Sequence, residues 1–157
     1  MTRDMGGSAQ GFETRGRLGP VTLLISFTVL GHRPMAPITG AGLDTVIPRS
    51  TGAIGHGLTL EEGQAAARLC ALNTLAVAGA ACGGDFSRLR LLSLSGFIRC
   101  VPEFGQQAKV MDGASEVFLQ ALGDNGKQVR TAVGVYALPG QAPVEIFTIF
   151  EMVNDND

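Results

Sequence analysis

The sequence contains no tryptophan, only one tyrosine and few charged residues. Proteins that hold single-stranded nucleic acid usually stack the bases on several aromatic side chains and follow the backbone with basic ones. Here only 17% of the 157 residues are charged and the net charge is −2, with an isoelectric point of about 5.6. This composition argues against nucleic acid as a partner and against ribonuclease activity.

The few cysteines and histidines do not form a metal-binding pattern. Cys70, Cys82 and Cys100 are widely separated, and neither His32 nor His56 has a second ligand at metal-binding spacing. An odd number of cysteines without a paired spacing is also a poor disulfide framework. We therefore expect buried thiols in a cytoplasmic protein, and no metal site.

Long hydrophobic stretches are missing as well. The most apolar run, LGPVTLLISFTVLG at residues 18–31, is too short to span a membrane. Asp4 and Glu13 precede it, and no convincing signal-cleavage motif follows it. We expect no membrane partner, a loose N-terminal segment over residues 1–17 and a single domain over residues 18–157.

The clearest local signal is a helix start. The sequence TLEE at Thr59–Glu62 is a capping box, in which the threonine hydroxyl and the glutamate side chain each bond the other residue's backbone amide. The helix is predicted to end near Gly83 and Gly84. Residues at helical spacing mark its predicted buried face: Leu69, Leu72, Leu75 and Ala76.

The remaining segments complete a pattern of strands and helices. A second helix is predicted over residues 109–126, with Gly123 as its C-terminal cap. Strands are predicted over residues 21–30, 86–101, 129–138 and 144–153. Two helices on one face of a mixed sheet make an α+β domain. The other face of such a sheet would carry small and apolar residues, so we expect an oligomer.

The last third of the chain, VRTAVGVYALPGQAPVEIFTIFEM, carries Arg130 near its start and Glu145 after its turn. We expect a hairpin about the sequence PGQAP. In that register Arg130 and Glu145 would lie about seven residues apart, roughly 23 Å at ~3.3 Å per residue. They would not pair within one chain, so joining them at one site would need a second copy. Each could bind a ligand or form a structural ion pair.

Three stretches together resemble the reactive intermediate deaminase family, also called Rid, YjgF or endoribonuclease L-PSP. They are GAIGHGLTLEEGQAAARLCALNTLAVAG, FGQQAKVMDGASEVF and the last third quoted above, and they cover about residues 52–153. The most specific part is the spacing of Arg130, Pro139 and Glu145. The resemblance implies a chorismate-mutase-like fold and a homotrimer, in which the three sheets form an inner barrel with clefts between subunits.

The resemblance also implies a chemistry. Active members hydrolyse 2-aminoacrylate and 2-iminobutyrate to 2-keto acids and ammonia without a cofactor. By resemblance, Arg130 binds the substrate carboxylate and Glu145 positions the hydrolytic water. Asp112 stands where many members have asparagine and Ala132 where some have cysteine, so both are candidate substrate-binding residues together with Gly113.

Other readings of these residues stay open at this point. Asp112 could cap the second helix, and Gly113 could permit close packing. The family's N-terminal tyrosine has no counterpart, because Tyr136 lies in another element, and its Ser-Gly-Gln turn is echoed only by Thr39-Gly40. The sequence therefore favours an imine deaminase, with a non-catalytic trimer that binds a small carboxylate metabolite as the alternative. Ribonuclease activity is the third candidate.

Overall fold

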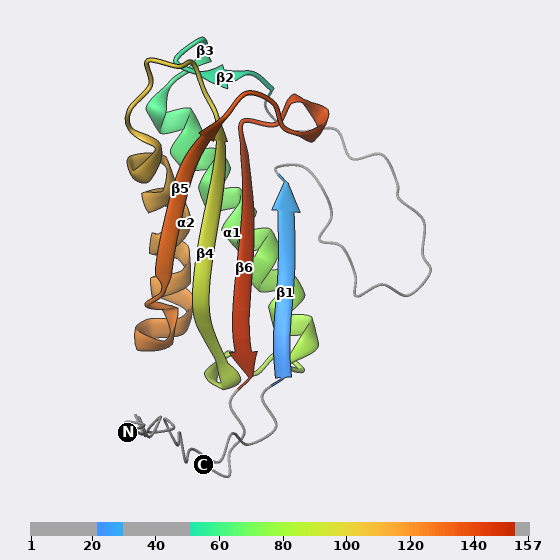
Figure 1. Cartoon of the computed structure of the whole chain (residues 1–157). Helices are drawn as coiled ribbons and strands as arrows, with labels where there is room; N and C mark the ends of the chain where they lie inside the picture. The colour runs from blue at the N-terminus through green and yellow to red at the C-terminus, as the bar shows by residue number, and fades with distance from the viewer. Residues whose placement is uncertain (1–21, 30–50, 153–157) are drawn as a thin grey trace, which may run out of the picture.

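The computed structural model describes residues 22–29 and 51–152. They form a four-stranded sheet with two long helices behind it in the view of Figure 1. The predicted α+β fold is therefore confirmed, whereas the segment predicted for residues 1–17 and the Thr39-Gly40 turn lie outside the described residues. The elements in chain order are β1 (Thr22–Val29), β2 (Ala53–Ile54), β3 (Gly57–Leu58), α1 (Leu60–Ala81), β4 (Leu89–Arg99), α2 (Gln107–Leu122), β5 (Val129–Val135) and β6 (Val144–Met152).

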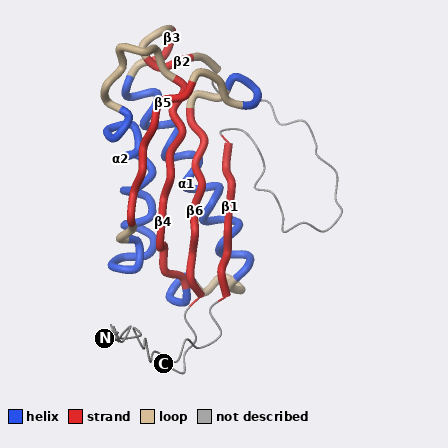
Figure 2. Tube along the Cα trace, viewed as in Figure 1, coloured by secondary structure: helices blue, strands red, loops and turns tan. Residues whose placement is uncertain are grey.

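The sheet order is β1-β6-β4-β5, with β4 and β5 parallel and the other neighbours antiparallel. The predicted hairpin of the last two strands is thus wrong, because β4 lies between β5 and β6 (Figure 2). The chain leaves β4, forms α2 and returns as β5, and such a crossover places the two strands in parallel. The turn around Pro139–Gln141 then carries the chain past β4 to its other side.

A bulge in β4 changes which side chains face the helices. The register shifts between Leu91 and Ser93, so Leu92 does not share a face with Leu94, as simple alternation would predict. Leu91 and Leu94 are buried against the helices, while Leu92 is 38% exposed. An alternating sequence cannot reveal such an extra residue, since the bulge depends on how the neighbouring strand pairs.

Helix α1 begins as predicted. The Glu62 amide donates to the Thr59 hydroxyl at 3.2 Å, and the Thr59 amide donates to the Glu62 carboxylate at 2.8 Å. The predicted buried face is wrong for Leu72, which is 51% exposed, and for Ala76, which is also exposed. The face that packs against α2 and the sheet consists mainly of small residues, because close approach of the elements leaves little room: Gly63, Ala66, Ala67, Cys70, Ala71, Thr74, Leu75, Ala78 and Gly79.

Removing the capping box should destabilise the protein. Thr59→Ala deletes the hydroxyl acceptor and is expected to lower the free energy of unfolding by about 1 kcal/mol, measured by urea denaturation. Glu61→Ala is the matched control, because Glu61 lies in the same first turn but outside the capping box. Glu61→Ala should lower the free energy of unfolding by about 0.5 kcal/mol, because it removes only the interaction of a negative charge with the helix dipole. Equal effects of the two substitutions would contradict a specific role of the box.

Helix α2 lies close to both α1 and the sheet because two glycines leave room for it. A Cβ at Gly113 would overlap the backbone carbonyl of Gln64 on α1, and a Cβ at Gly96 on β4 would overlap the Met111 side chain. Val110, Val117, Phe118 and Leu122 of α2 are all in the core. Gly123 caps the helix with φ of 58°, as predicted.

The face of the sheet away from α1 and α2 carries mixed side chains. By strand alternation, Ser93, Ser95, Phe97 and Arg99 of β4 and Glu145, Phe147, Ile149 and Glu151 of β6 lie there. On β5, Val129 is 75% and Val133 is 41% exposed on the same face. Within residues 22–29 and 51–152, no helix is both long and apolar enough to cross a membrane.

Candidate functional site

Arg130 stands on the edge strand β5 and points toward α2. Its partner on β4 is Leu94, whose side chain is fully buried on the helix side of the sheet. The Arg130 Nη1 donates to Asp112 Oδ1 at 2.8 Å and to Ser115 Oγ at 3.0 Å. Asp112 and Ser115 lie three residues apart on α2, and this spacing puts both on the helix surface that faces β5.

This arrangement uses only one nitrogen of the guanidinium. Among the described residues, Nε and Nη2 of Arg130 make no hydrogen bond. These two nitrogens form the side of the planar group that matches the two oxygens of a carboxylate. The Arg130 side chain is 29% exposed, so a ligand can reach it. Ser115 is in turn held by Gln128, whose Nε2 donates to Ser115 Oγ at 3.1 Å.

Asp112 is therefore not a helix cap. It lies inside α2, which begins at Gln107, and its carboxylate pairs with Arg130 while its side chain is 47% exposed. An exposed pair of this kind contributes at most about 1 kcal/mol to stability. Asp112 fixes the position of the guanidinium without preventing a ligand carboxylate from binding its other side.

Ala132 and Gly113 have different surroundings. Ala132 is two residues after Arg130 on β5, half-buried beside Gly96, and shares the helix side with Arg130. Gly113 is buried and faces Gln64 of α1. This position supports the hypothesis that Gly113 permits close packing of α1 and α2, rather than contact with a substrate.

Glu145 lies on the opposite face of the sheet from Arg130. It pairs with Phe97 of β4 and Val29 of β1, whereas its neighbours Val144 and Ile146 are buried under the helices. The register places Arg130 level with Thr148, three residues from Glu145, with β4 between the two strands. The separation is therefore about 10 Å along the strands and about 10 Å across them, not the 23 Å expected from a hairpin.

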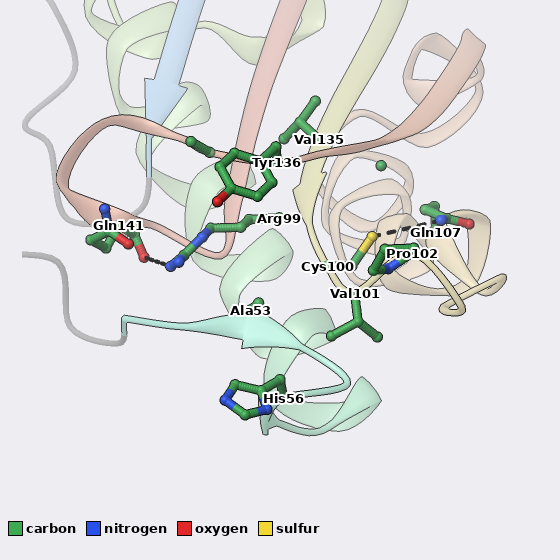
Figure 3. A pocket seen from close by; sticks show the side chains of 12 residues that line it. Ala53, His56, Arg99, Cys100, Val101, Pro102, Gln107, Val135, Tyr136 and Gln141 are labelled. Atoms are coloured by element: carbon green, nitrogen blue, oxygen red, sulfur yellow. Dashed lines mark hydrogen bonds between the residues drawn. The ribbon is translucent and has the colours of Figure 1, made fainter.

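A second cluster of functional groups, not predicted from the sequence, surrounds a pocket at the end of the sheet (Figure 3). The pocket has a volume of about 690 Å³ and lies where β4, β5 and the β2–β3 region meet. Its polar lining consists of His56, Arg99, Cys100, Gln107, Tyr136 and Gln141. The only hint in the sequence is a charged residue, Arg99, at the end of an apolar strand and before a proline.

The walls of this pocket are fixed by backbone hydrogen bonds. The amide of Val101 donates to the carbonyl of Ile54 at 3.0 Å, and the amide of Gly52 donates to the carbonyl of Gln141 at 3.1 Å. Gln141 has a positive φ of 59°, which is uncommon for a residue with a side chain. The left-handed backbone directs its carbonyl toward both Gly52 and Arg99.

The cysteines differ in their surroundings. Cys70 is fully buried in α1, and burial, followed by the negative charge of Glu145, raises the pKa of its thiol to about 12. Since the unfolded thiol ionises near pH 9, the stability gained by keeping Cys70 protonated is present below pH 9. It is lost as the pH rises toward 12. Cys100, by contrast, is only partly buried and lines the pocket.

Alkylation should distinguish these thiols. At pH 8.5, iodoacetamide is expected to modify Cys100 at least about tenfold faster than Cys70, because Cys70 is both inaccessible and protonated. Peptide mass spectrometry over time would measure each rate, with urea-unfolded protein as the control in which all three cysteines react. Equal rates for Cys70 and Cys100 in the folded protein would contradict the burial of Cys70.

In the part of the chain that the structure describes, no three side chains among histidine, cysteine, aspartate and glutamate gather as a metal site would require. The three cysteines are free thiols.

Comparison with known proteins identifies solved structures with a similar fold. No family model matches the sequence. The structure of Atu1372 from Agrobacterium tumefaciens, a protein of unknown function, is similar with a TM-score of 0.71 and 36% identity, over 85% of this chain and 82% of that one. A Shewanella oneidensis MR-1 protein described as a candidate endoribonuclease has a TM-score of 0.69 at 22% identity, over 96% and 92% of the two chains.

This chain and Atu1372 belong to one family, and the fold is that of the Rid/YjgF proteins. The resemblance found in the sequence is thereby supported. Protein TCP17 from Trypanosoma cruzi is 42% identical over 106 residues, which are 66% of this chain and 66% of that protein. The match thus spans slightly less than two thirds of that curated relative.

Proposed function

We propose that this Rid/YjgF-like protein is a hydrolytic deaminase that converts small enamine or imine carboxylates to 2-keto acids and ammonia. The observation that carries the proposal is the guanidinium of Arg130, which Asp112 and Ser115 hold through one nitrogen while Nε and Nη2 stay available. Two parallel donors of this kind suit a carboxylate, which every substrate of this class carries. Ala132, the neighbour on the same side of β5, leaves space for a small substrate body.

The reaction needs little beyond positioning. The carbon of a C=N bond is electrophilic, so water adds to it once the substrate is held by its carboxylate. Glu145 accepts a proton from that water and returns a proton to the nitrogen. In the carbinolamine that results, the same carboxylate moves the hydroxyl proton to the nitrogen, so the C–N bond breaks as the C=O bond forms, ammonia leaves and the keto acid remains. General acid–base catalysis by one carboxylate contributes ~10²–10⁴-fold, and no metal or organic cofactor is required.

The proposal requires more than one copy of the chain. Arg130 and Glu145 of one copy lie on opposite faces of the sheet, so we propose that a homotrimer combines Arg130 of one subunit with Glu145 of another. The exposed valines of β5 support this arrangement, because an apolar strand at a sheet edge favours association.

The mass in solution checks the assembly. Size-exclusion chromatography with light scattering is expected to give about three times the chain mass of 16.3 kDa. Glu151→Ala, which removes a charge from the same face as Glu145 at the far end of the strand, should leave an apolar interface intact. A monomer at micromolar concentration would contradict the shared site.

A coupled assay tests the function. A dehydratase or an amino-acid oxidase generates the short-lived imine, and keto acid release is measured with and without the purified protein. Acceleration by the protein supports the deaminase. If the protein does not accelerate release but a small carboxylate raises its thermal midpoint, the result would favour the non-catalytic trimer. The Arg130–Asp112 ion pair is compatible with that alternative, because it gives Arg130 a structural partner. Salt-dependent RNA binding would instead favour the ribonuclease named for the Shewanella protein.

A further inference from the structure

We propose that the pocket around Arg99 is a second ligand site, which binds a small molecule that joins a carboxylate to a compact apolar body. The pocket has a volume of about 690 Å³, within the range of 300–1,000 Å³ that is usual for small-molecule sites. The deaminase mechanism proposed above does not use Arg99.

The charge of the pocket selects an anion. Of the twelve described residues that line it, Arg99 is cationic, and none is an aspartate or a glutamate. Glu145 is on the same face of the sheet as Arg99, on the neighbouring strand β6. Among the described residues, the salt bridges found do not involve Arg99.

The hydrogen bonding of Arg99 is incomplete. Its Nε is buried and has no partner among the described protein atoms. Its Nη1 reaches the carbonyl of Gln141 at 3.4 Å, which is longer than a strong hydrogen bond. Buried polar groups in native proteins almost always have hydrogen-bond partners. We therefore infer that a ligand atom in the pocket accepts a hydrogen bond from the Arg99 guanidinium. A ligand carboxylate supplies two such acceptors.

The remaining walls define the rest of the ligand. Val101, Pro102, Val135 and Ala137 give apolar surface, and the Tyr136 ring lines the open side, where its side chain is 97% exposed. Figure 3 shows Arg99 pointing toward Gln141, with Cys100 pointing toward Gln107 on the other side of the pocket. A ring or a branched alkyl group suits such a wall, with the carboxylate directed to Arg99.

Within one subunit this pocket is separate from Arg130, although Glu145, which the proposed trimer would bring to Arg130 of another subunit, lies on the strand next to Arg99. Arg99 pairs with Val135, five residues beyond Arg130 along β5, about 16 Å away at the usual rise. The two arginines also point to opposite faces of the sheet, because Arg130 is level with buried Leu94 and Arg99 alternates with buried Ile98. Substitutions can therefore test the two sites independently.

The experiment uses benzoate as the probe and the full chain in its natural assembly. Binding is measured by titration, while the arginine Nε–H signals are followed in ¹H–¹⁵N spectra and assigned by the loss of one signal in Arg99→Lys. Benzoate is expected to bind saturably and to shift the Arg99 Nε–H signal. Benzamide, which has the same shape without the charge, should bind at least about tenfold more weakly, since bonds to charged groups are the stronger ones.

Matched variants locate the site. Arg99→Gln should weaken benzoate binding at least tenfold, and Arg99→Lys should retain part of it through charge alone. Arg130→Gln should change it less than twofold. The proposal is overturned if benzoate fails to bind at 20 mM, a concentration of about 20 times a weak millimolar Kd. It is also overturned if Arg130→Gln abolishes benzoate binding, Arg99→Gln leaves binding unchanged and benzoate does not shift the Arg99 Nε–H signal. That result would leave the deaminase proposal standing.

Discussion

Arg130→Ala is expected to lower kcat/KM for keto acid release by about 10²-fold. The substitution removes two charge-assisted hydrogen bonds to the substrate carboxylate, a loss of about 3 kcal/mol at ~1.5 kcal/mol each. Folding should be little affected, because the Asp112 left behind has a side chain that is 47% exposed and can be hydrated. The measurement is the coupled assay at several substrate concentrations, with the thermal midpoint as a check on folding.

Two controls make this result specific. Arg68→Ala removes another exposed arginine–glutamate pair, the one between Arg68 on α1 and Glu116 on α2, where the side chains are 45% and 58% exposed. It should leave activity within about twofold, since exposed pairs contribute at most about 1 kcal/mol. Arg130→Lys keeps the charge but loses the planar fork, so its activity should lie between wild type and Arg130→Ala. Equal losses for Arg68→Ala and Arg130→Ala would point to a stability effect.

Mixing variants tests whether the two catalytic groups come from different copies. Arg130→Ala and Glu145→Gln should each retain about 1% of wild-type activity or less when alone. When the two are refolded together at equal amounts, about one quarter of the clefts should receive Arg130 from one copy and Glu145 from another, because half of the copies carry each residue intact. Activity should recover to about a quarter of wild type. No recovery, despite mixed trimers, would place both groups in one copy and rule out the shared cleft.

Gly113→Ala is expected to destabilise the protein by about 3 kcal/mol, the largest single effect on stability we predict. Its new Cβ would overlap the backbone carbonyl of Gln64, which cannot rotate away as a side chain would. The two helices must then separate, and the core residues between them lose contact. In an exposed helix the same change would stabilise by about 1 kcal/mol, so even the sign of the effect tests the packing. Urea denaturation measures it.

Gly105→Ala is the matched control for this substitution. A Cβ at Gly105 meets nothing within 4 Å, and its backbone is not left-handed. It should change the free energy of unfolding by less than about 0.5 kcal/mol. If Gly113→Ala were as mild as Gly105→Ala, the contact between α1 and α2 would be looser than described.

Local chemistry explains which parts of the fold could be predicted. The capping box at Thr59 and Glu62 satisfies backbone amides within a single turn, so it specifies the start of α1 without reference to the rest of the chain. The C-terminal cap of α2 at Gly123 is similarly local. The family resemblance, by contrast, depends on three stretches of sequence together, of which the spacing of Arg130, Pro139 and Glu145 is the most specific part.

What the sequence could not determine depends on pairing between distant segments. The PGQAP turn favours a hairpin, but the parallel return of β5 beside β4 decides the sheet order, because the helix between them must pack against one face. The face of Glu145 and the bulge at Leu92 follow from that order. The pairing of Arg130 with Asp112 joins residues 18 positions apart, and the pocket around Arg99 brings together segments as distant as Ala53 and Gln141. The sequence by itself determined the two long helices, the four strands of the main sheet and the family resemblance, and the tertiary structure decided which charged groups share a face.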